Sequence, residues 1–219
     1  MGESVLAQLI APQNNCCHLC ERLLHSHELY LCEDCLQDIY RSRIMFPERK
    51  IRLNDALVVY SACWYEKRVR SLIQDIKYHH DPFLAEIAGY VLGEVFVEQN
   101  ILQHEYPLVI PVPTHAKRLE ERGYNQAELI AKVFARTAML DMDANLVERT
   151  RFTGSQVKRN RNERLQAMKD AFQPLGSLEG RQIILVDDVL TTGATITACA
   201  EALMKGGASS VTGFTVCRA

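Results

Sequence analysis

The chain has 219 residues, of which 47% are hydrophobic and 24% are charged, and its formal net charge at pH 7 is −2. This composition predicts a globular protein with one sizeable core and excludes a polycationic protein, so any contact with nucleic acid requires a local basic patch. The chain contains no apolar run close to the roughly 20 residues of a membrane span, and its first residues lack the basic start of a secretion signal. We therefore expect a cytoplasmic protein without a membrane span.

Cysteine and histidine residues crowd the segment 14–40, which has too few large apolar residues to form a core of its own. Two Cys-x2-Cys pairs in this segment are separated by eleven residues, a spacing suited to one zinc ion held by four thiolates. The predicted ligands are Cys17, Cys20, Cys32 and Cys35. Because an ion at this position would replace the missing core, we predict a structural zinc module over residues 1–45.

Three alternatives stay open for this module. An iron–sulfur cluster is compatible with the same four cysteines. Cys16 stands beside Cys17, so the register of the first pair can shift by one residue. A histidine can also take the place of one thiolate, and the candidates for such a replacement are His18, His25 and His27.

Alternating strand and helix patterns begin near residue 56, after a polar connector at 41–56. Runs of branched and aromatic residues predict strands, and apolar residues at helical spacing predict helices. The predicted strands are 56–65, 107–113, 145–150, 181–188 and 210–219, and the predicted helices are 66–78, 83–99, 125–139 and 194–208. This alternation predicts an α/β domain over residues 46–219, with a parallel sheet flanked by helices on both faces.

The three cysteines outside the zinc module fall in apolar strand or helix segments. Cys63, Cys199 and Cys217 are therefore interpreted as small core residues rather than as nucleophiles. Two aromatic residues, Trp64 and Tyr65, stand at the end of a predicted strand. We interpret them as packing residues rather than as a platform on which bases stack.

Two adjacent carboxylates, Asp187 and Asp188, end the predicted strand 181–188. Ligands of open α/β sheets bind beyond the carboxyl ends of the strands, where such charges can meet a ligand. The following residues lead into a helix whose first amides attract anions: Thr191, Thr192, Gly193, Ala194 and Thr195. Because carboxylates accept hydrogen bonds from sugar hydroxyls, we expect a ligand with a vicinal diol and a phosphate, such as ribose 5-phosphate.

Two basic segments are candidates for binding the anionic part of such a ligand. The segment 111–128 follows a strand at the same sheet edge, and its polar residues, in a turn that contains glycine, are Lys117, Arg118, Arg122, Asn125 and Gln126. The segment 149–169 has seven Lys or Arg residues and one acid, and its candidates are Gln156, Lys158, Arg159, Arg161 and Arg164. This second segment is interpreted as a lid over the ligand, as a track for a nucleic-acid backbone, or as a solvated basic helix.

The stretch IILVDDVLTTGAT resembles the phosphoribosyl-pyrophosphate (PRPP) signature of type I phosphoribosyltransferases. Together with the paired cysteines and the stretch RGYNQ at 122–126, it makes nearly the whole chain resemble the ComF family. The resemblance implies a type I phosphoribosyltransferase-like fold with an N-terminal zinc finger. It also implies ribose hydroxyls on Asp187 and Asp188, the 5-phosphate on residues 191–195, and Mg²⁺ bound through the pyrophosphate of PRPP.

Further positions match family-typical polar residues: Lys77, Arg118, Arg122, Gly123, Asn125, Gln126, Gln156 and Arg164. The chain departs from the family pattern in the basic segment. Arg159 stands where an aliphatic residue is usual, and Ala167 stands where asparagine is expected. This departure concerns the role of the lid and leaves the PRPP loop intact.

The resemblance further implies a role in natural competence and in the handling of incoming single-stranded DNA. The first hypothesis is a phosphoribosyltransferase that moves ribose 5-phosphate from PRPP to an acceptor nitrogen. Its expected catalytic residues are Asp187, Asp188, Arg118 and Arg122, and Lys77 and Lys117 are expected to help bind PRPP.

The alternative hypothesis is a non-catalytic protein that responds to PRPP or a nucleotide and binds single-stranded DNA through its finger and lid, together with other competence proteins. An interaction scaffold with a vestigial site is a weaker reading, because packing alone gives no reason to keep Asp187 and Asp188.

Overall fold

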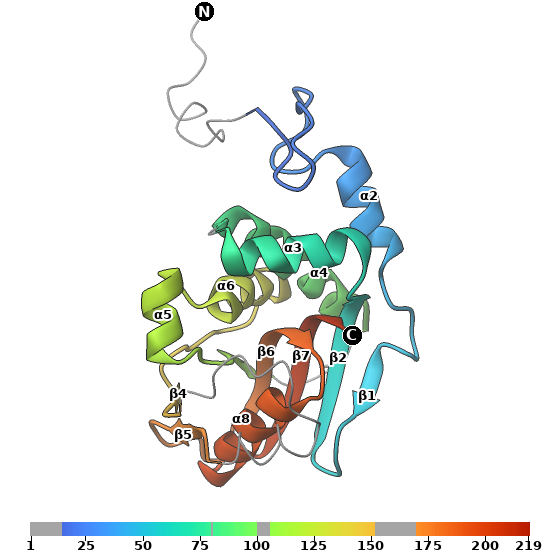
Figure 1. The fold of residues 1–219 in the computed structure, drawn as a ribbon. Helices are drawn as coiled ribbons and strands as arrows, with labels where there is room; N and C mark the ends of the chain where they lie inside the picture. The colour runs from blue at the N-terminus through green and yellow to red at the C-terminus, as the bar shows by residue number, and fades with distance from the viewer. Residues whose placement is uncertain (1–14, 80, 100–105, 152–169) are drawn as a thin grey trace, which may run out of the picture.

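The structure is a computed structural model that describes residues 15–79, 81–99, 106–151 and 170–219 (Figure 1). Its centre is a five-stranded sheet with the strand order β1-β2-β7-β6-β3. The strands are β1 (Lys50–Arg52), β2 (Leu57–Trp64), β3 (Leu108–Pro111), β6 (Gln182–Leu190) and β7 (Ser210–Arg218). The last four pair in parallel, which confirms the predicted parallel sheet, whereas β1 pairs antiparallel with β2 at the edge.

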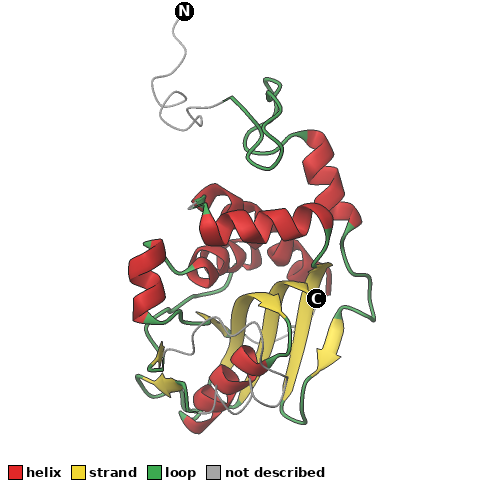
Figure 2. Ribbon diagram, in the orientation of Figure 1, coloured by secondary structure: helices red, strands yellow, loops and turns green. Residues whose placement is uncertain are grey.

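Helices cover both faces of this sheet (Figure 2). The helices are α2 (Glu33–Arg41), α3 (Lys67–Tyr78), α4 (Pro82–Gln99), α5 (Ala116–Arg122), α6 (Gln126–Ala138) and α8 (Ala194–Lys205). Helices α4 and α6 share a core cluster with Ile184 and Val186, while α8 packs with Ile183 and Leu185 on the opposite face. Alternate residues of β6 therefore point to opposite faces, as a strand period of two requires. Among the helices in the part of the chain that is described, none combines the length and apolar character needed to cross a membrane.

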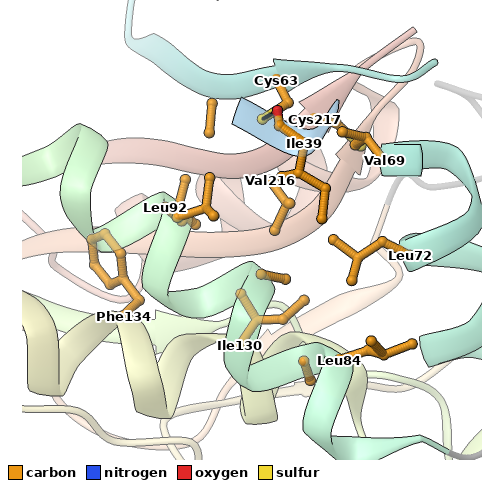
Figure 3. Close-up of a cluster of buried hydrophobic side chains, with 14 of the residues drawn as sticks. Ile39, Cys63, Val69, Leu72, Leu84, Leu92, Ile130, Phe134, Val216 and Cys217 are labelled. Atoms are coloured by element: carbon orange, nitrogen blue, oxygen red, sulfur yellow. Dashed lines mark hydrogen bonds between the residues drawn. The ribbon is translucent and has the colours of Figure 1, made fainter. Parts of the chain in front are cut away.

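The larger core cluster is continuous from the α/β sheet to the cysteine module. Its centre includes Phe134, Leu92 and Val216, which Figure 3 shows between α4, α6 and the sheet. The same cluster contains buried residues of the cysteine segment and α2: Cys17, Leu24, Leu31, Cys32, Cys35 and Ile39. The cysteine module thus has no separate core and shares the one beneath α3 and α4.

Three isolated cysteines behave as predicted. Cys63, Cys199 and Cys217 are all fully buried. Cys63 and Cys217 are register partners on β2 and β7, and Figure 3 shows them together beside Ile39. Burial raises the pKa of the Cys63 thiol to about 12, so this group stays protonated and acts as a small core side chain.

Several elements differ from the predicted pattern. The predicted strand 145–150 exists as β4 (Val147–Arg149), but it pairs antiparallel with β5 (Phe172–Pro174) in a separate two-stranded sheet. The connector 41–56 contains β1, which was not predicted because its residues are exposed or half-buried and give no apolar pattern. The predicted turn of the segment 111–128 is helix α5, which ends at Gly123 in the left-handed conformation. Strand β6 continues to Leu190, so the two acids lie within the strand rather than at its last residues.

Candidate functional site

A cavity of about 330 Å³ opens at the carboxyl ends of the parallel strands. Nine predicted site residues line it: Lys77, Arg118, Arg122, Asn125, Gln126, Asp187, Asp188, Thr191 and Thr195. The other lining residues are Tyr65, Tyr78, Val112, Pro113, Thr114, Arg149 and Val189. The fold therefore brings α3, α5, α6, β4 and β6 to one site, as expected for the edge at which α/β sheets bind ligands.

The remaining predicted residues fall into two groups. Thr192, Gly193 and Ala194 form the turn next to the cavity without lining it, and Lys117 is exposed on α5 outside it. The lid candidates lie outside the described residues, and their role stays a prediction: Gln156, Lys158, Arg159, Arg161 and Arg164.

The acid pair reaches the cavity because β3 is shorter than β6. The last paired residues of the two strands are Pro111 and Val186, and the N–H of Val112 then donates to the Val186 carbonyl at 2.8 Å. Beyond this point β6 keeps only β7 as a neighbour. Asp187 and Asp188 thus lie on the part of β6 that has lost β3 as a neighbour, and both line the cavity.

Asp188 is buried and is held by an ion pair. The Lys77 ammonium lies 2.8 Å from its carboxylate, and the Gln126 amide donates to the same oxygen at 3.5 Å. Burial alone would raise the pKa of Asp188, but the charge and hydrogen bond of Lys77, the Val189 N–H and the Arg122 charge together lower that pKa. The same attraction raises the pKa of Lys77 against the effect of its own burial. Both groups therefore stay charged at neutral pH.

Asp187 has a different environment. Burial and the neighbouring charge of Asp188 raise its pKa to about 7, although the Asp188 N–H, Lys77 and Arg149 act in the opposite direction. The N–H of Asp188 donates to its carboxylate at 2.9 Å. The two acids thus differ in protonation near neutral pH, because like charges this close resist joint ionisation.

We expect Asp187→Asn to stabilise the ligand-free protein at pH 8 more than at pH 5. The pKa of this carboxyl group is about 4 in the unfolded chain and about 7 in the folded protein, so the folded state holds the proton more tightly. The free energy of unfolding therefore falls as pH rises from about 4 to about 7. Asparagine lacks this titration. Thermal unfolding of both proteins between pH 5 and 8 measures the difference, and a gain that is constant with pH would contradict the assigned cause.

The turn after β6 is shaped for an anion. Gly193 caps α8 with a positive φ of 78°, and a Cβ at this position would lie 2.8 Å from the Leu53 side chain. The left-handed backbone conformation thus favours glycine here, and any larger residue would also displace the end of the Leu53 side chain. The first amides of α8 lie beside Thr191 and Thr195, and such amides attract an anion by roughly 0.3–1 kcal/mol.

Four cationic side chains line the cavity together with the two acids. Arg118 and Arg122 project from α5, Lys77 from α3, and Arg149 from the end of β4. Burial lowers the pKa of Arg149, while the charge of Asp187 opposes this shift. The excess of positive charge among the described lining residues favours a ligand with several phosphate oxygens.

Sequence reasoning missed part of the lining. Arg149 lies near the end of the predicted strand 145–150, and a basic residue at a strand end was the available signal. Tyr78 stands next to Lys77, but its place in the cavity depends on where α3 ends. The interpretation of Trp64 and Tyr65 as packing residues was incomplete: Tyr65 packs against the core and also lines the cavity, and the Trp64 side chain is 38% exposed.

The four predicted metal ligands come together in space. The sulfur atoms of Cys17, Cys20, Cys32 and Cys35 all lie within 4.8 Å of one another, and those of Cys20 and Cys32 are 3.6 Å apart. A tetrahedral zinc site with Zn–S bonds of about 2.3 Å places its sulfurs about 3.8 Å apart, so this geometry fits zinc. Burial would raise the pKa of Cys32, but hydrogen bonds from the Cys35 N–H and Arg22 lower it to about 7, which favours the thiolate.

Of the alternatives for this cluster, the geometry addresses the register of the first pair and the histidine replacement. The sulfur of Cys16 is not part of the group. His18 interacts with Asp81 and makes edge contacts with the rings of Tyr30 and Phe83. The rings of His25 and His27 stack on each other at 5.9 Å. Among the described residues, the group that could hold a metal ion therefore consists of the four cysteines that the spacing indicated.

Comparisons with known proteins relate this chain to one protein family. Residues 119–219 match the family described as phosphoribosyl transferase domain. Competence protein ComFC of Bacillus subtilis is 30% identical over 203 residues, which cover 92% of this chain and 77% of that protein. DNA utilization protein YhgH of Escherichia coli O157:H7 is 34% identical over 156 residues, which cover 70% of this chain and 69% of that protein. Among solved structures, an adenine phosphoribosyltransferase aligns with 84% of this chain and 89% of its own chain, at 12% identity and a TM-score of 0.45.

Proposed function

Because this chain belongs to the ComF family of proteins with a phosphoribosyl transferase domain, we propose that its cavity binds PRPP and that the protein acts in natural competence and DNA use. One observation carries the proposal. A carboxylate pair and a helix N-terminus lie at the same cavity, so acceptors for a sugar diol stand beside donors for a phosphate. The relatives' names supply the cellular context.

In the proposed complex, Asp187 and Asp188 accept hydrogen bonds from the ribose 2- and 3-hydroxyls. The turn at 191–195 binds the 5-phosphate with its amides and threonine hydroxyls. Arg118 and Arg122 on α5 bind the pyrophosphate, for which guanidinium groups are well suited. Mg²⁺ held by the pyrophosphate neutralises part of the charge that develops on this group.

The proposed reaction is the transfer of ribose 5-phosphate to an acceptor nitrogen. The nitrogen lone pair forms a bond to C1 of the ribose, the bond from C1 to the pyrophosphate oxygen breaks, and pyrophosphate leaves with the electron pair. The nitrogen then loses its proton to solvent. The residues contribute by orienting the sugar and by stabilising charge, with the acids near the positive ribose ring and the arginines near the leaving group.

The proposed metal is a structural zinc ion on Cys17, Cys20, Cys32 and Cys35. The support is the separation of their sulfurs and the burial of three of the four side chains, each 1% exposed. A buried thiolate cluster excludes water, as structural zinc sites do.

Ribose 5-phosphate is expected to bind about 10- to 150-fold more tightly than 2-deoxyribose 5-phosphate. The deoxy sugar keeps the phosphate but lacks one hydroxyl, and a hydrogen bond to a charged group contributes about 1.5–3 kcal/mol. Isothermal titration calorimetry of both sugars, and of PRPP with Mg²⁺, measures this ratio. Equal affinities would show that the acids do not grip the diol.

A second candidate function is non-catalytic binding of single-stranded DNA under the control of PRPP. The observation in its favour is the set of four cations at the cavity, together with the DNA-related names of the relatives. The two candidates differ in one measurement. A transferase releases pyrophosphate from PRPP when bases, amines or oligonucleotides are offered as acceptors, whereas a binding protein releases none and changes its DNA affinity with PRPP.

A further inference from the structure

Helix α3 lies across the carboxyl ends of the central strands, and we refer to it as the roof helix (Figure 1). Both of its ends are fixed to the sheet or its neighbours. Just before the helix, the N–H of Tyr65 donates to the Arg218 carbonyl at 2.8 Å. At its other end Lys77 forms the ion pair with Asp188, and the Tyr124 hydroxyl donates to the Ile76 carbonyl. The residues that flank the roof helix are therefore held at the mouth of the cavity.

Aromatic side chains line the cavity at both ends of the roof helix. Tyr65 precedes the helix, and Tyr78 is its last residue. The Tyr78 side chain is 64% exposed, although the guanidinium of Arg122 lies 5.6 Å from the centre of its ring. The Tyr78 ring is thus accessible at the edge of the polar cavity, and its cation–π contact with Arg122 favours this position.

A second aromatic and cationic pair lies on the same edge. Trp64 and Arg218 are register partners at the ends of β2 and β7, and the guanidinium lies 4.3 Å from the centre of the indole ring. The Trp64 side chain is 38% exposed. The edge therefore carries two pairs of an aromatic ring and a guanidinium, Tyr78 with Arg122 and Trp64 with Arg218. Tyr65 directly follows Trp64 in the chain.

These groups match the chemistry of an unpaired nucleobase. Aromatic rings stack on any base, and Arg218 beside Trp64 is a cation that can pair with a phosphate between successive bases. When the acids and the turn hold the diol and the 5-phosphate, C1 of the ribose faces the remaining lining, which includes the ends of the roof helix. A planar group stacked there would lie beside the reacting carbon.

We propose that Tyr65 and Tyr78 form a subsite for an unpaired nucleobase at the mouth of the PRPP cavity, a step that rests on the proposed function. The base comes from one of two sources, a free base or nucleoside, or a single strand of nucleic acid. The Trp64–Arg218 pair does not line the cavity but lies at the ends of β2 and β7, where a single strand that extends beyond the subsite would meet it. The subsite supplies the acceptor half of the site that the sequence motifs did not reveal.

The test compares ring-removing and ring-preserving variants in oligonucleotide binding. With PRPP and Mg²⁺ present, Tyr78→Ala is expected to bind a fluorescently labelled single-stranded 10-mer about 5- to 150-fold more weakly, and Tyr78→Phe is expected to bind it normally. Tyr106→Ala serves as the matched control, because Tyr106 is 93% exposed and precedes β3 at the opposite end of the strands. The single tryptophan of the chain gives an independent readout, since a base stacked beside Trp64 quenches its fluorescence.

The possible outcomes distinguish the failure of the base subsite from the failure of the proposed PRPP site. If Tyr78→Ala binds both PRPP and the oligonucleotide as the unmodified protein does, the subsite is wrong and the PRPP site stands. If the unmodified protein binds no PRPP, the proposed function fails. Competition by adenine or adenosine at equal affinity assigns the subsite to free bases. If the protein binds the single strand but not the free base or nucleoside, and binds a duplex more weakly, the subsite is assigned to a strand.

Discussion

Replacing Asp187 and Asp188 together with asparagine is expected to lower the affinity for PRPP by about 10²- to 10⁴-fold. Each carboxylate that accepts a hydrogen bond from the ribose contributes about 1.5–3 kcal/mol, and both contributions are lost. Asparagine keeps the shape of the side chains, so the cavity is retained. Isothermal titration calorimetry with PRPP and Mg²⁺ measures the loss.

The control for this variant concerns Lys77, which would lose its partner. A charge left unpaired after one member of a buried pair is removed destabilises the folded state. The double variant Lys77→Met with Asp188→Asn removes both charges and is expected to unfold closer to the unmodified protein than Asp188→Asn alone. If a well-folded variant without the acids bound PRPP normally, the assignment of the diol to these residues would be rejected.

Removal of the metal is expected to destabilise the entire chain rather than the cysteine module alone. Cys17, Cys32 and Cys35 are each 1% exposed and belong to the same core cluster as the roof helix and α4. Structural zinc contributes an apparent binding free energy of about 10–16 kcal/mol at pH 7 in small zinc modules, so its loss exceeds the stability of many domains. Cys35→Ser, or treatment with a strong chelator, is expected to lower the midpoint of thermal unfolding in a single transition.

The measurements are metal content by mass spectrometry and thermal unfolding with and without chelator. Cys16→Ser is the matched control, because the Cys16 sulfur lies outside the metal cluster. Metal loss is also expected to weaken PRPP binding. Arg68 of the roof helix donates to the Leu19 carbonyl at 3.4 Å and lies 4.0 Å from Asp38 of α2, so the module supports the helix that carries Lys77. An unchanged unfolding midpoint after complete metal removal would overturn this account.

The parallel sheet was predictable because its strands are buried on both faces. Such strands appear as continuous apolar runs, and 183–186 is one of them. The elements that were missed obey weaker rules. Strand β1 is a short exposed edge. Helix α2 has nine residues and buries Cys35 and Ile39, so its apolar pattern is too short to stand out beside the cysteine spacing.

The acid and threonine side of the site was predictable from contiguous residues. Asp187, Asp188 and the turn that follows them need only one strand and one helix to meet a ligand. The opposite side depends on tertiary structure. Tyr65 precedes the 12-residue roof helix and Tyr78 is its last residue. They line the same cavity only because this helix lies over the sheet edge. No local pattern encodes that placement.

The strand order has a consequence for biosynthesis. β7 spans residues 210–218, yet it lies between β2 and β6 and pairs with both. During translation, nothing in the sheet connects β2 with β6 until this later segment leaves the ribosome. Pairing of such distant segments is slow and leaves strand edges exposed meanwhile. The cysteine module and the helices therefore leave the ribosome before the sheet is complete. The acids of β6 acquire β7 as a neighbour strand last.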